Sequence, residues 1–351
     1  MGSILPDARK HAGVYQLQSR FITPSELSSL EPSRLLGVFL FQEQGQSLPH
    51  GVPRLSPGFS PFPQQPEIEV WLSPGPVVFE QVGPLKMAYD GKTLFGTLSL
   101  PDTDDVLHDI TQEAYRSIFQ NTERLGYPNL FRMWNYLPHI NEMDNSGLER
   151  YKAFCRGRAR AFFSDRTFGE TFLPAGTGVG SRSGGLDLAF MASVEKIQVN
   201  LENPVQVPAY HYPPQYGPRS PSFARGTWVH RAKDAGEFYV SGTASIIGHE
   251  TLHQDDITLQ CETSLKNIER LISSENLLRY ELDQNLTLRD LNSIRIYIRR
   301  HEDYPVVKRI CEAHFNPAAS VVYLGADICR TDLLVEIEGW IQKPLEGGPC
   351  F

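Results

Sequence analysis

The second half of the chain alternates strand-like runs with amphipathic helical segments, and this order restricts the possible folds most. The pattern predicts, in order, a strand over 236–245, a helix over 249–272, a strand over 293–298, a helix over 304–315 and strands over 320–326 and 333–341. The long helix carries apolar residues at spacings of three and four, which are Ile257, Cys261, Leu265, Ile268 and Ile272. A helix with one apolar face packs on a sheet, so we expect an α+β fold with helices on one face of a mixed sheet.

The first half also contains strand-like runs and helical segments. Short strand-like runs lie at 68–72, 77–82 and 93–100, and a helical pattern follows from residue 104 to about Gly126. A second helix is expected over 148–163. Residues 43–66 are rich in Pro, Gly, Ser and Gln, which predicts a loop or linker. The length of 351 residues fits two domains better than one.

Charge and composition exclude several classes of partner. The chain has 33 Lys and Arg against 41 Asp and Glu, a net charge of -8, so nucleic acid is not expected to bind. No run approaches the length of a membrane span, and the start MGSILPDARKHAG lacks the apolar core of a secretory signal, which predicts a cytoplasmic protein without membrane contact. The five cysteines are odd in number and form no CxxC pair, so reduced thiols are expected at Cys155, Cys261, Cys311, Cys329 and Cys350.

The segment His249-Glu250-Thr251-Leu252-His253 matches the H-E-x-x-H pattern of zinc hydrolases. Two histidines four residues apart bind one zinc ion only when both lie on one face of a helix. Here the motif directly follows Gly248, at the expected start of the long helix, and no third-ligand motif follows it. We therefore favour ordinary hydrogen bonds for both histidines and keep the zinc hydrolase as an alternative.

A glycine-rich run, Gly176 to Gly185, could cradle a phosphate with its backbone N–H groups. It lacks the GK[ST] ending of a P-loop and does not clearly open a helix. A structural turn near a site is the better interpretation. The lone serines lie in no nucleophile-elbow pattern, so a serine hydrolase is not favoured either.

Two groups of arginines could bind an anion. Arg156, Arg158 and Arg160 are spaced by two on the predicted helix, so they point in different directions and at most two can face one site. Arg219 and Arg225 lie in the loop 203–226, where six prolines and three tyrosines favour a shaped loop. A planar guanidinium in such a loop suits a carboxylate ligand.

Two glutamates lie on the last predicted strand. Glu336 and Glu338 share one face of the strand, and Val335 and Ile337 share the other. If the glutamates face the interior, burial raises the pKa of a carboxyl group, as a general acid at neutral pH requires. If they face solvent, they are ordinary surface charges, and the pattern alone leaves both interpretations open.

Several ordered blocks resemble a known family. The run YLGADICRTDLLVEIEGWI is similar to the end of a RidA/YjgF-type domain, in which a strand of this kind supplies a glutamate to the ligand site. Together with the four blocks RMWNYLPHIN, RYKAFCRGRARAF, PAYHYPPQYGPRSPSFARGT and SGTASIIGHETLHQDDITLQCETSLKNIERL, it resembles the chorismatases. The similarity extends from about Gly126 to Gly339.

The resemblance implies two RidA/YjgF-like (chorismate-mutase-like) units with mixed sheets and helices on one face. The first would be a degenerate domain over 1–145 and the second a catalytic domain over 146–351. It implies Glu336 as the acid that protonates the enolpyruvyl methylene of chorismate. It also implies that Arg158, Tyr212, Arg225 and Arg309 hold the two carboxylates, and that Tyr216 and Gly242 belong to the same substrate-binding site.

Gly242 and Cys329 resemble the branch of the family that forms 3-hydroxybenzoate together with pyruvate. Formation of 4-hydroxybenzoate or of a dihydrodiol stays open. The family uses neither metal nor organic cofactor, so none is expected here, and chorismate is the expected small-molecule partner. A monomer or small homo-oligomer is expected. A zinc hydrolase and a non-catalytic RidA-like ligand-binding protein remain as alternatives from other classes.

Overall fold

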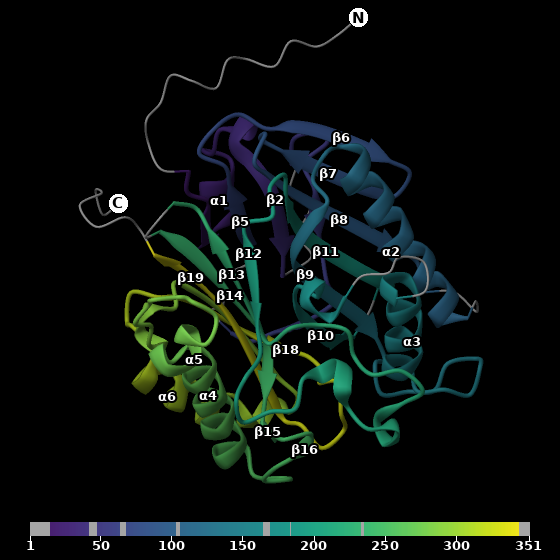
Figure 1. Cartoon of the computed structure of the whole chain (residues 1–351), viewed down its shortest axis with the longest axis vertical. Helices are drawn as coiled ribbons and strands as arrows, with labels where there is room; N and C mark the ends of the chain where they lie inside the picture. The colour runs from purple at the N-terminus through teal and green to yellow at the C-terminus, as the bar shows by residue number, and fades with distance from the viewer. Residues whose placement is uncertain are drawn as a thin grey trace, which may run out of the picture.

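The computed structural model describes residues 15–41, 48–63, 68–102, 106–163, 169–182, 184–232 and 235–343. The expected helix start at residue 104, Cys350, the N-terminal segment and parts of the 43–66 loop lie outside the described residues. The described strands form three main sheets, and the helices of the two larger sheets lie on opposite sides of the molecule (Figure 1). This is an α+β fold with mixed sheets, as the sequence predicts.

A six-stranded sheet in the order β10-β9-β11-β8-β7-β6 forms one half of the molecule. Its strands are β6 (Val78–Val82), β7 (Leu85–Tyr89), β8 (Thr93–Leu100), β9 (Asn129–Pro138), β10 (Ala175–Ser181) and β11 (Leu186–Ser193). Strands β10 and β9 are parallel and the other pairs are antiparallel. Helices α2 (Leu107–Arg124) and α3 (Arg150–Phe163) bury their apolar faces against one side of this sheet.

A seven-stranded sheet in the order β12-β13-β14-β19-β17-β18-β4 forms the other half. Its strands are β4 (Ser60–Pro61), β12 (Gln198–Leu201), β13 (Gly226–His230), β14 (Gly236–Ala244), β17 (Ser293–Ile298), β18 (Ser320–Gly325) and β19 (Val335–Lys343). Only β17 and β18 run parallel among its paired described strands. One face is covered by the helices α4 (Ile257–Ile272), α5 (Ser274–Leu278) and α6 (Tyr304–His314).

A smaller four-stranded sheet in the order β1-β5-β2-β3 completes the core. It consists of β1 (Gln18–Ile22), β2 (Leu35–Leu40), β3 (Arg54–Leu55) and β5 (Ile68–Leu72), with the short helix α1 (Pro24–Leu27) between β1 and β2. Its inner face contributes Phe39 and Trp71 to a cluster with Trp134 of β9 and Trp340 of β19. The faces of the two larger sheets that carry no helices therefore pack toward each other, and the site lies at this junction.

Most predicted elements of the second half are confirmed within one or two residues, because their hydrophobic periodicity is strong. The predicted start of the long helix is wrong. Residues 246–251 form a hairpin of β15 (Ile246–Ile247) and β16 (Glu250–Thr251), and both Gly248 and His253 have a φ of 58°. The helix begins only after Asp256, whose carboxylate accepts a hydrogen bond of 2.9 Å from the backbone N–H of Leu259.

The glycine-rich run is also different from the prediction, because most of it is strand β10. Its glycines allow close packing at an interface between segments. A Cβ atom at Gly180 would lie 2.8 Å from Cβ of Asp327, and one at Gly176 would lie 3.0 Å from Cβ of Phe223. These positions therefore require glycine because neighbouring segments approach the strand closely, and not because the chain turns there.

The expected domain boundary at residue 145 lies between β9 and β10, which are neighbours in one sheet. We therefore propose that the two halves of the chain divide after Ser193, at the end of β11.

None of the helices in the described part of the chain has the length and apolar character that a membrane crossing requires.

Candidate active site

A cavity of about 240 Å³ lies where β10, at the edge of the six-stranded sheet, passes β14 of the seven-stranded sheet. Its wall comes from β10, β14, β19, helix α3, the loop before β13 and the segment between β18 and β19. The residues that line it are Glu149, Tyr151, Lys152, Arg158, Gly176, Thr177, Gly178, Tyr212, Gln215, Tyr216, Pro221, Phe223, Arg225, Gly242, Ala244, Ile246, Cys329, Arg330, Thr331, Asp332 and Glu336.

Glu336 is the buried carboxyl group of this cavity. On β19 its neighbours Val335 and Ile337 pack into the core beneath the helices, so alternation along the strand turns Glu336 to the opposite, helix-free face. The residue is 4% exposed. Burial raises the pKa of its carboxyl group from 4.5 to about 8, the nearby charge of Glu338 adds to this, and Arg132 and Arg225 oppose it. The group therefore carries a proton at neutral pH.

Gly242 on β14 gives the Glu336 side chain its space. A Cβ atom at position 242 would lie 1.9 Å from Oε1 of Glu336, a distance that no side chain can occupy. Glycine is thus a condition for the observed position of the carboxyl group.

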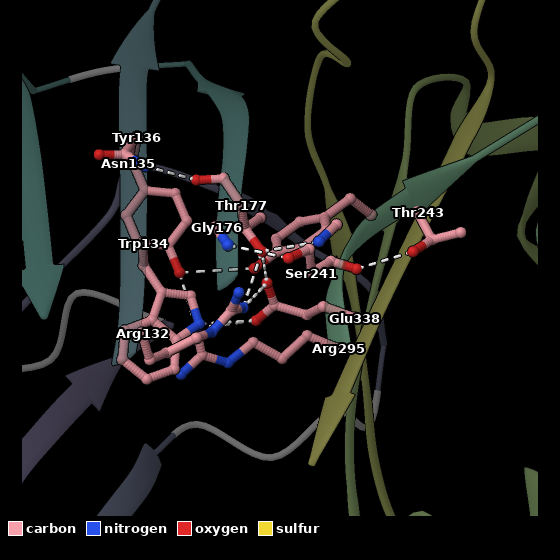
Figure 2. Close-up of polar contacts among 12 residues, drawn as sticks. Arg132, Trp134, Asn135, Tyr136, Gly176, Thr177, Ser241, Thr243, Arg295 and Glu338 are labelled. Carbon is pink, nitrogen blue, oxygen red and sulfur yellow. Dashed lines mark hydrogen bonds and ion pairs between the residues drawn. The ribbon is translucent and has the colours of Figure 1, made fainter. Parts of the chain in front are cut away.

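A second carboxyl group, Glu338, lies two residues further along the same face and is held by several donors (Figure 2). Arg132 Nη2 and Trp134 Nε1 donate to it over 2.7 Å and 2.9 Å, and the hydroxyl of Thr177 donates to Oε2. Arg295 Nη1 lies 3.3 Å from Oε1. Glu338 is therefore engaged in the contact between the sheets, and Glu336 is the carboxyl group that faces the cavity.

Arg158 presents a buried cation to the cavity from helix α3. The residue is 3% exposed, and its Nε and Nη2 atoms have no hydrogen-bond partner among the described residues. Its guanidinium lies near the rings of Tyr115 and Phe154, at 5.6 Å and 5.9 Å from their centroids. Aromatic contacts do not satisfy guanidinium N–H donors, so this arrangement suits an anion that enters the cavity.

Arg225 is the second buried cation. Its Nη2 donates to the Tyr212 hydroxyl over 2.7 Å and to the backbone carbonyl of Val207 over 3.0 Å. Its Nε is buried without a hydrogen-bond partner among the described residues, and Glu202 Oε2 lies 4.0 Å away. Burial raises the pKa of the Glu202 carboxyl to about 7, although Arg225 opposes the shift.

Arg330 is the third cation, from the segment before β19. Its guanidinium stacks 3.9 Å from the ring centroid of Tyr216 and 5.2 Å from that of Tyr212. Nη1 donates to the backbone carbonyl of His249 over 2.9 Å, and Nη2 is buried with no partner among the described residues. Three arginines, each with a buried N–H group that makes no hydrogen bond among the described residues, thus surround one small cavity, and this arrangement suits an anionic ligand.

Cys329 lies beside these groups. Burial and the neighbouring Glu336 raise the pKa of its thiol to about 12, against the effect of Arg330. The side chain is therefore a neutral, small and polarizable group at neutral pH.

The structure brings together seven of the eight predicted site residues, namely Glu336, Cys329, Arg158, Tyr212, Tyr216, Arg225 and Gly242. The prediction for Arg309 needs correction. It lies exposed on α6, which covers the helix side of the seven-stranded sheet, so it cannot reach this cavity. Arg219 is exposed outside the cavity, and Arg160 pairs with Asp109 at the surface over 3.2 Å.

Among the lining residues that the sequence analysis did not single out are Tyr151, Arg330 and Thr177. Tyr151 is seven residues before Arg158, and this spacing on one helix face could have indicated it. Arg330 directly follows Cys329 in the block that resembles the family. Thr177 lies in the run that was interpreted as a turn, and no local pattern distinguishes it.

The H-E-x-x-H segment does not have the geometry that zinc requires. His249 lies in the turn of the β15–β16 hairpin and His253 lies after the hairpin, so the two side chains do not share a helix face. Over the described ranges, no three His, Cys, Asp or Glu side chains gather in a group that could hold a metal ion. His249 instead contacts Tyr216, with 3.2 Å between Nδ1 and the hydroxyl.

The fold and the cavity together define an α+β protein in which three arginines and the buried carboxyl group of Glu336 gather around one cavity. The family pattern "Chorismatase FkbO/Hyg5-like, N-terminal" matches residues 69–192. A 3-hydroxybenzoate synthase of Streptomyces hygroscopicus is 43% identical over 299 residues, which cover 84% of this chain and 87% of that protein. The chain belongs to the chorismatase family.

The solved structures agree. The crystal structure of a chorismatase superposes with a TM-score of 0.88 at 36% identity and covers 94% of this chain and 100% of that one. The similarity to RidA/YjgF proteins is partial: RidA from Psychrobacter sp. PAMC 21119 covers 35% of this chain, with 14% identity and a TM-score of 0.27.

Proposed function

We propose that this protein cleaves the enolpyruvyl ether of chorismate to give pyruvate and 3-hydroxybenzoate. The observation that carries the proposal is the position of Glu336, a protonated carboxyl group at the wall of a cavity that also holds three arginines with free N–H groups. Chorismate is a dianion with an acid-labile enol ether, so it needs these two features together. The similarity to a 3-hydroxybenzoate synthase supports this product.

Glu336 acts as the general acid in the proposed reaction. It donates its proton to the methylene carbon of the enolpyruvyl group, which becomes the methyl group of pyruvate. The adjacent carbon becomes an oxocarbenium centre. A carboxyl group with a pKa of about 8 still holds its proton at pH 7, yet is acidic enough to donate it.

Arg158, Arg225 and Arg330 hold the two carboxylates of the substrate, and the hydroxyl of Tyr212 fixes the orientation of Arg225. Tyr216 keeps the Arg330 guanidinium in place by stacking. Buried donors that are already oriented stabilise charge more strongly than water does.

Capture of the oxocarbenium centre decides the product. In the proposed branch the oxygen of the neighbouring ring hydroxyl bonds to this centre and the hydroxyl loses its proton. The bond from this oxygen to the ring then breaks with loss of the proton on the adjacent ring carbon, the original ether bond to the centre breaks, and pyruvate leaves with the former hydroxyl oxygen. One of the two released protons goes to the new phenol oxygen, and the other restores the acid Glu336. The two products together contain all atoms of chorismate, so no water is consumed. A dihydrodiol would require one water molecule. Cys329, as a neutral thiol beside Glu336, offers no strong site for such a water.

Incubation of the purified protein with chorismate tests the proposal. We expect equal amounts of pyruvate and 3-hydroxybenzoate by chromatography, and in D₂O a pyruvate methyl group with one deuterium. Prior treatment with a chelator should leave the rate unchanged, since no step uses a metal ion.

Other results would change the assignment. A dihydrodiol or 4-hydroxybenzoate as the main product would keep the protein in the family but reject this branch. Binding of chorismate without pyruvate release would indicate the non-catalytic ligand-binding alternative.

A further inference from the structure

A cluster of buried charged side chains lies between the two larger sheets, next to Glu336, and packing of the sheets alone does not require charges there. It contains two acids and two cations, Glu338, Glu69, Arg132 and Arg295, which are each at most 3% exposed. Arg295 donates through Nε to Glu69 over 2.7 Å and through Nη1 to the Tyr136 hydroxyl over 2.7 Å. Burial of four charges is expensive and seldom adds stability over an apolar core, so a role beyond packing is reasonable.

Thr177 lines the cavity and also contacts this cluster, and Figure 2 shows its contacts with Glu338 and Arg132. Its hydroxyl donates to Glu338 Oε2 and accepts from Arg132 Nη2 over 2.7 Å. It also accepts from the backbone N–H of Gly242 over 3.1 Å. The hydroxyl thus makes all three hydrogen bonds of which it is capable. One of them holds the backbone of Gly242, whose missing side chain leaves room for Glu336.

The cluster also places a charge close to the acid. Glu336 and Glu338 are two residues apart on one face of β19, a separation of about 7 Å along the strand. In the cluster two cations balance two anions, so an ionised Glu336 would add a third buried anion to this side of the cavity.

We propose that Glu338 and Thr177 are positioning residues for the acid Glu336, with Glu338 maintaining its protonated form by charge and Thr177 maintaining its place through Gly242. The inference rests on the proposed function insofar as it concerns catalysis. Burial and the nearby charge of Glu338 both raise the pKa of the Glu336 carboxyl, which agrees with this proposed role of Glu338.

The other groups around Glu336 do not compete for this role. Glu338 and Arg132 act on it from the cluster between the sheets. The charged and titratable groups that line the same cavity are Arg225, Cys329, Tyr151, Arg158, Arg330, Lys152, Glu149, Asp332, Tyr212 and Tyr216. Burial raises the pKa of the Cys329 thiol to about 12 and that of the Tyr151 hydroxyl well above its usual value, so both stay neutral between pH 6 and 9. Glu202, behind Arg225, titrates near pH 7 and serves as a second reporter.

The first test follows titration of the Glu336 carboxyl directly, without substrate, by ¹³C NMR of protein labelled at the glutamate side-chain carboxyl carbons. The signal is assigned by its loss in Glu336→Gln, and a second signal by its loss in Glu202→Gln. In Glu338→Gln we expect the midpoint of Glu336 to fall by about one pH unit or more, because a like charge is removed and Arg132 is left unbalanced. The Glu202 midpoint should not move. An unchanged Glu336 midpoint in a folded Glu338→Gln protein rejects the charge role.

The second test uses kinetics with chorismate. The basic limb of the kcat/KM profile, which reports the free enzyme, should shift in Glu338→Gln with the NMR midpoint, which reduces kcat/KM about tenfold at pH 9 but less than about twofold at pH 6. A loss by the same factor at every pH would mean that Glu338 is only structural. If wild-type protein releases no pyruvate, the proposed function fails, while the NMR titration still decides the electrostatic inference.

Thr177 provides a variant pair in case Glu338→Gln does not fold. Thr177→Val removes the hydroxyl and keeps the shape, and Thr177→Ser keeps the hydroxyl. We expect Thr177→Val to reduce kcat at least tenfold with little change in KM, since Arg158 and Arg225 are untouched, and Thr177→Ser to restore most of it. Equal activity of the two variants, or a loss confined to KM, would overturn the role of the hydroxyl.

Discussion

Glu336 combines three properties at one residue: it is buried, it lies on the face of β19 toward the cavity, and its pKa is raised to about 8. Glu336→Gln keeps the size of the side chain but removes the acidic proton. We expect kcat for pyruvate release to fall by at least about a hundredfold, the usual size of a general-acid contribution. The measurement is a coupled pyruvate assay, with circular dichroism to show that the variant is folded. Turnover within a few fold of wild type would assign the proton transfer to another group.

Gly242 is predicted to be important only because it has no side chain and so leaves room for Glu336. Gly242→Ala places a methyl group 1.9 Å from the present position of Glu336 Oε1, so the carboxyl group must move. We expect kcat to fall by about a hundredfold, since a displacement near 1 Å at a reacting group has effects of this size. Gly75→Ala is the matched control, because no heavy atom of the described residues lies within 4 Å of its added carbon. A normal rate in Gly242→Ala would show that Glu336 has freedom to adapt.

Cys329 is predicted to influence the product more than the stability. Its neutral thiol occupies the cavity wall beside Glu336, and Cys329→Ala leaves room that a water molecule can enter. Capture by water should then compete with capture by the ring hydroxyl. Chromatography of the products should show a larger dihydrodiol fraction or slower aromatisation. An unaltered yield and rate of 3-hydroxybenzoate would reduce Cys329 to a packing residue.

The loop before β13 carries Arg225, one of the three arginines proposed to hold the substrate carboxylates, and the tyrosines Tyr212 and Tyr216. Prolines fix its backbone, two 3₁₀ turns at Ala209–His211 and Pro214–Tyr216 give it regular geometry, and Arg225 lies at its end. Arg225→Lys keeps the charge but loses the planar donor pair that reaches Tyr212 and Val207. A charge-assisted hydrogen bond is worth roughly 1.5 to 3 kcal/mol, so kcat/KM for chorismate should fall about tenfold or more.

Helix α3 provides the control for this prediction. Arg158→Ala removes a cavity cation and should reduce kcat/KM at least as strongly, whereas Arg160→Ala removes only a surface contact with Asp109. Equal small losses at Arg225, Arg158 and Arg160 would mean that the arginines supply only a general positive field.

The same elements explain what the sequence could predict. Helix α6 and strands β17 and β19 have strong periodicity, and alternation along β19 correctly paired Glu336 with Glu338 on one face. Strands β9, β10 and β11 were missed, because each is buried almost throughout and has no alternation, and because β10 is rich in glycine. Residues 249–256, which include the second strand of the hairpin, were assigned to the helix, since periodicity further along the chain extended the pattern backward past Asp256, the actual N-cap.

For the site, the resemblance to the family predicted most of the residues, and the structure shows which of them lie together and what they contact. Arg309 was placed in the site by resemblance, yet only the three-dimensional packing of α6 shows that it faces away. The partners of Glu338 come from β9, β10 and β17, which are up to 206 positions away in sequence. No local pattern reports contacts of this kind.

At the scale of the whole molecule, the site exists only because the two larger sheets pack against each other. Thr177 belongs to the six-stranded sheet, while Gly242 and Glu336 belong to the seven-stranded sheet. Separation of the sheets would expose Glu336 to water and return its pKa toward the ordinary value. Packing of the two sheets therefore raises the pKa of the Glu336 carboxyl. Burial of the ionised form of this group is unfavourable, so it opposes packing of the sheets.

This opposition predicts a pH dependence of stability that depends on Glu336. Below pH 4.5 the carboxyl is protonated in both folded and unfolded chains, so its full contribution to stability is present. Between pH 4.5 and about 8 the unfolded chain releases the proton and the folded chain keeps it, so stability falls as pH rises, and above about 8 the loss is complete.

Glu336→Gln removes this pH-dependent contribution to stability. The free energy of unfolding of the variant relative to wild type should therefore increase from pH 5 to pH 8, by an amount on the order of a few kcal/mol, and then level off. Urea unfolding of both proteins at several pH values measures it, with Glu142→Gln at an exposed position as the control that should show no such trend. A constant difference between Glu336→Gln and wild type over this range would mean that the carboxyl group is hydrated in the folded protein and is not held as a buried acid.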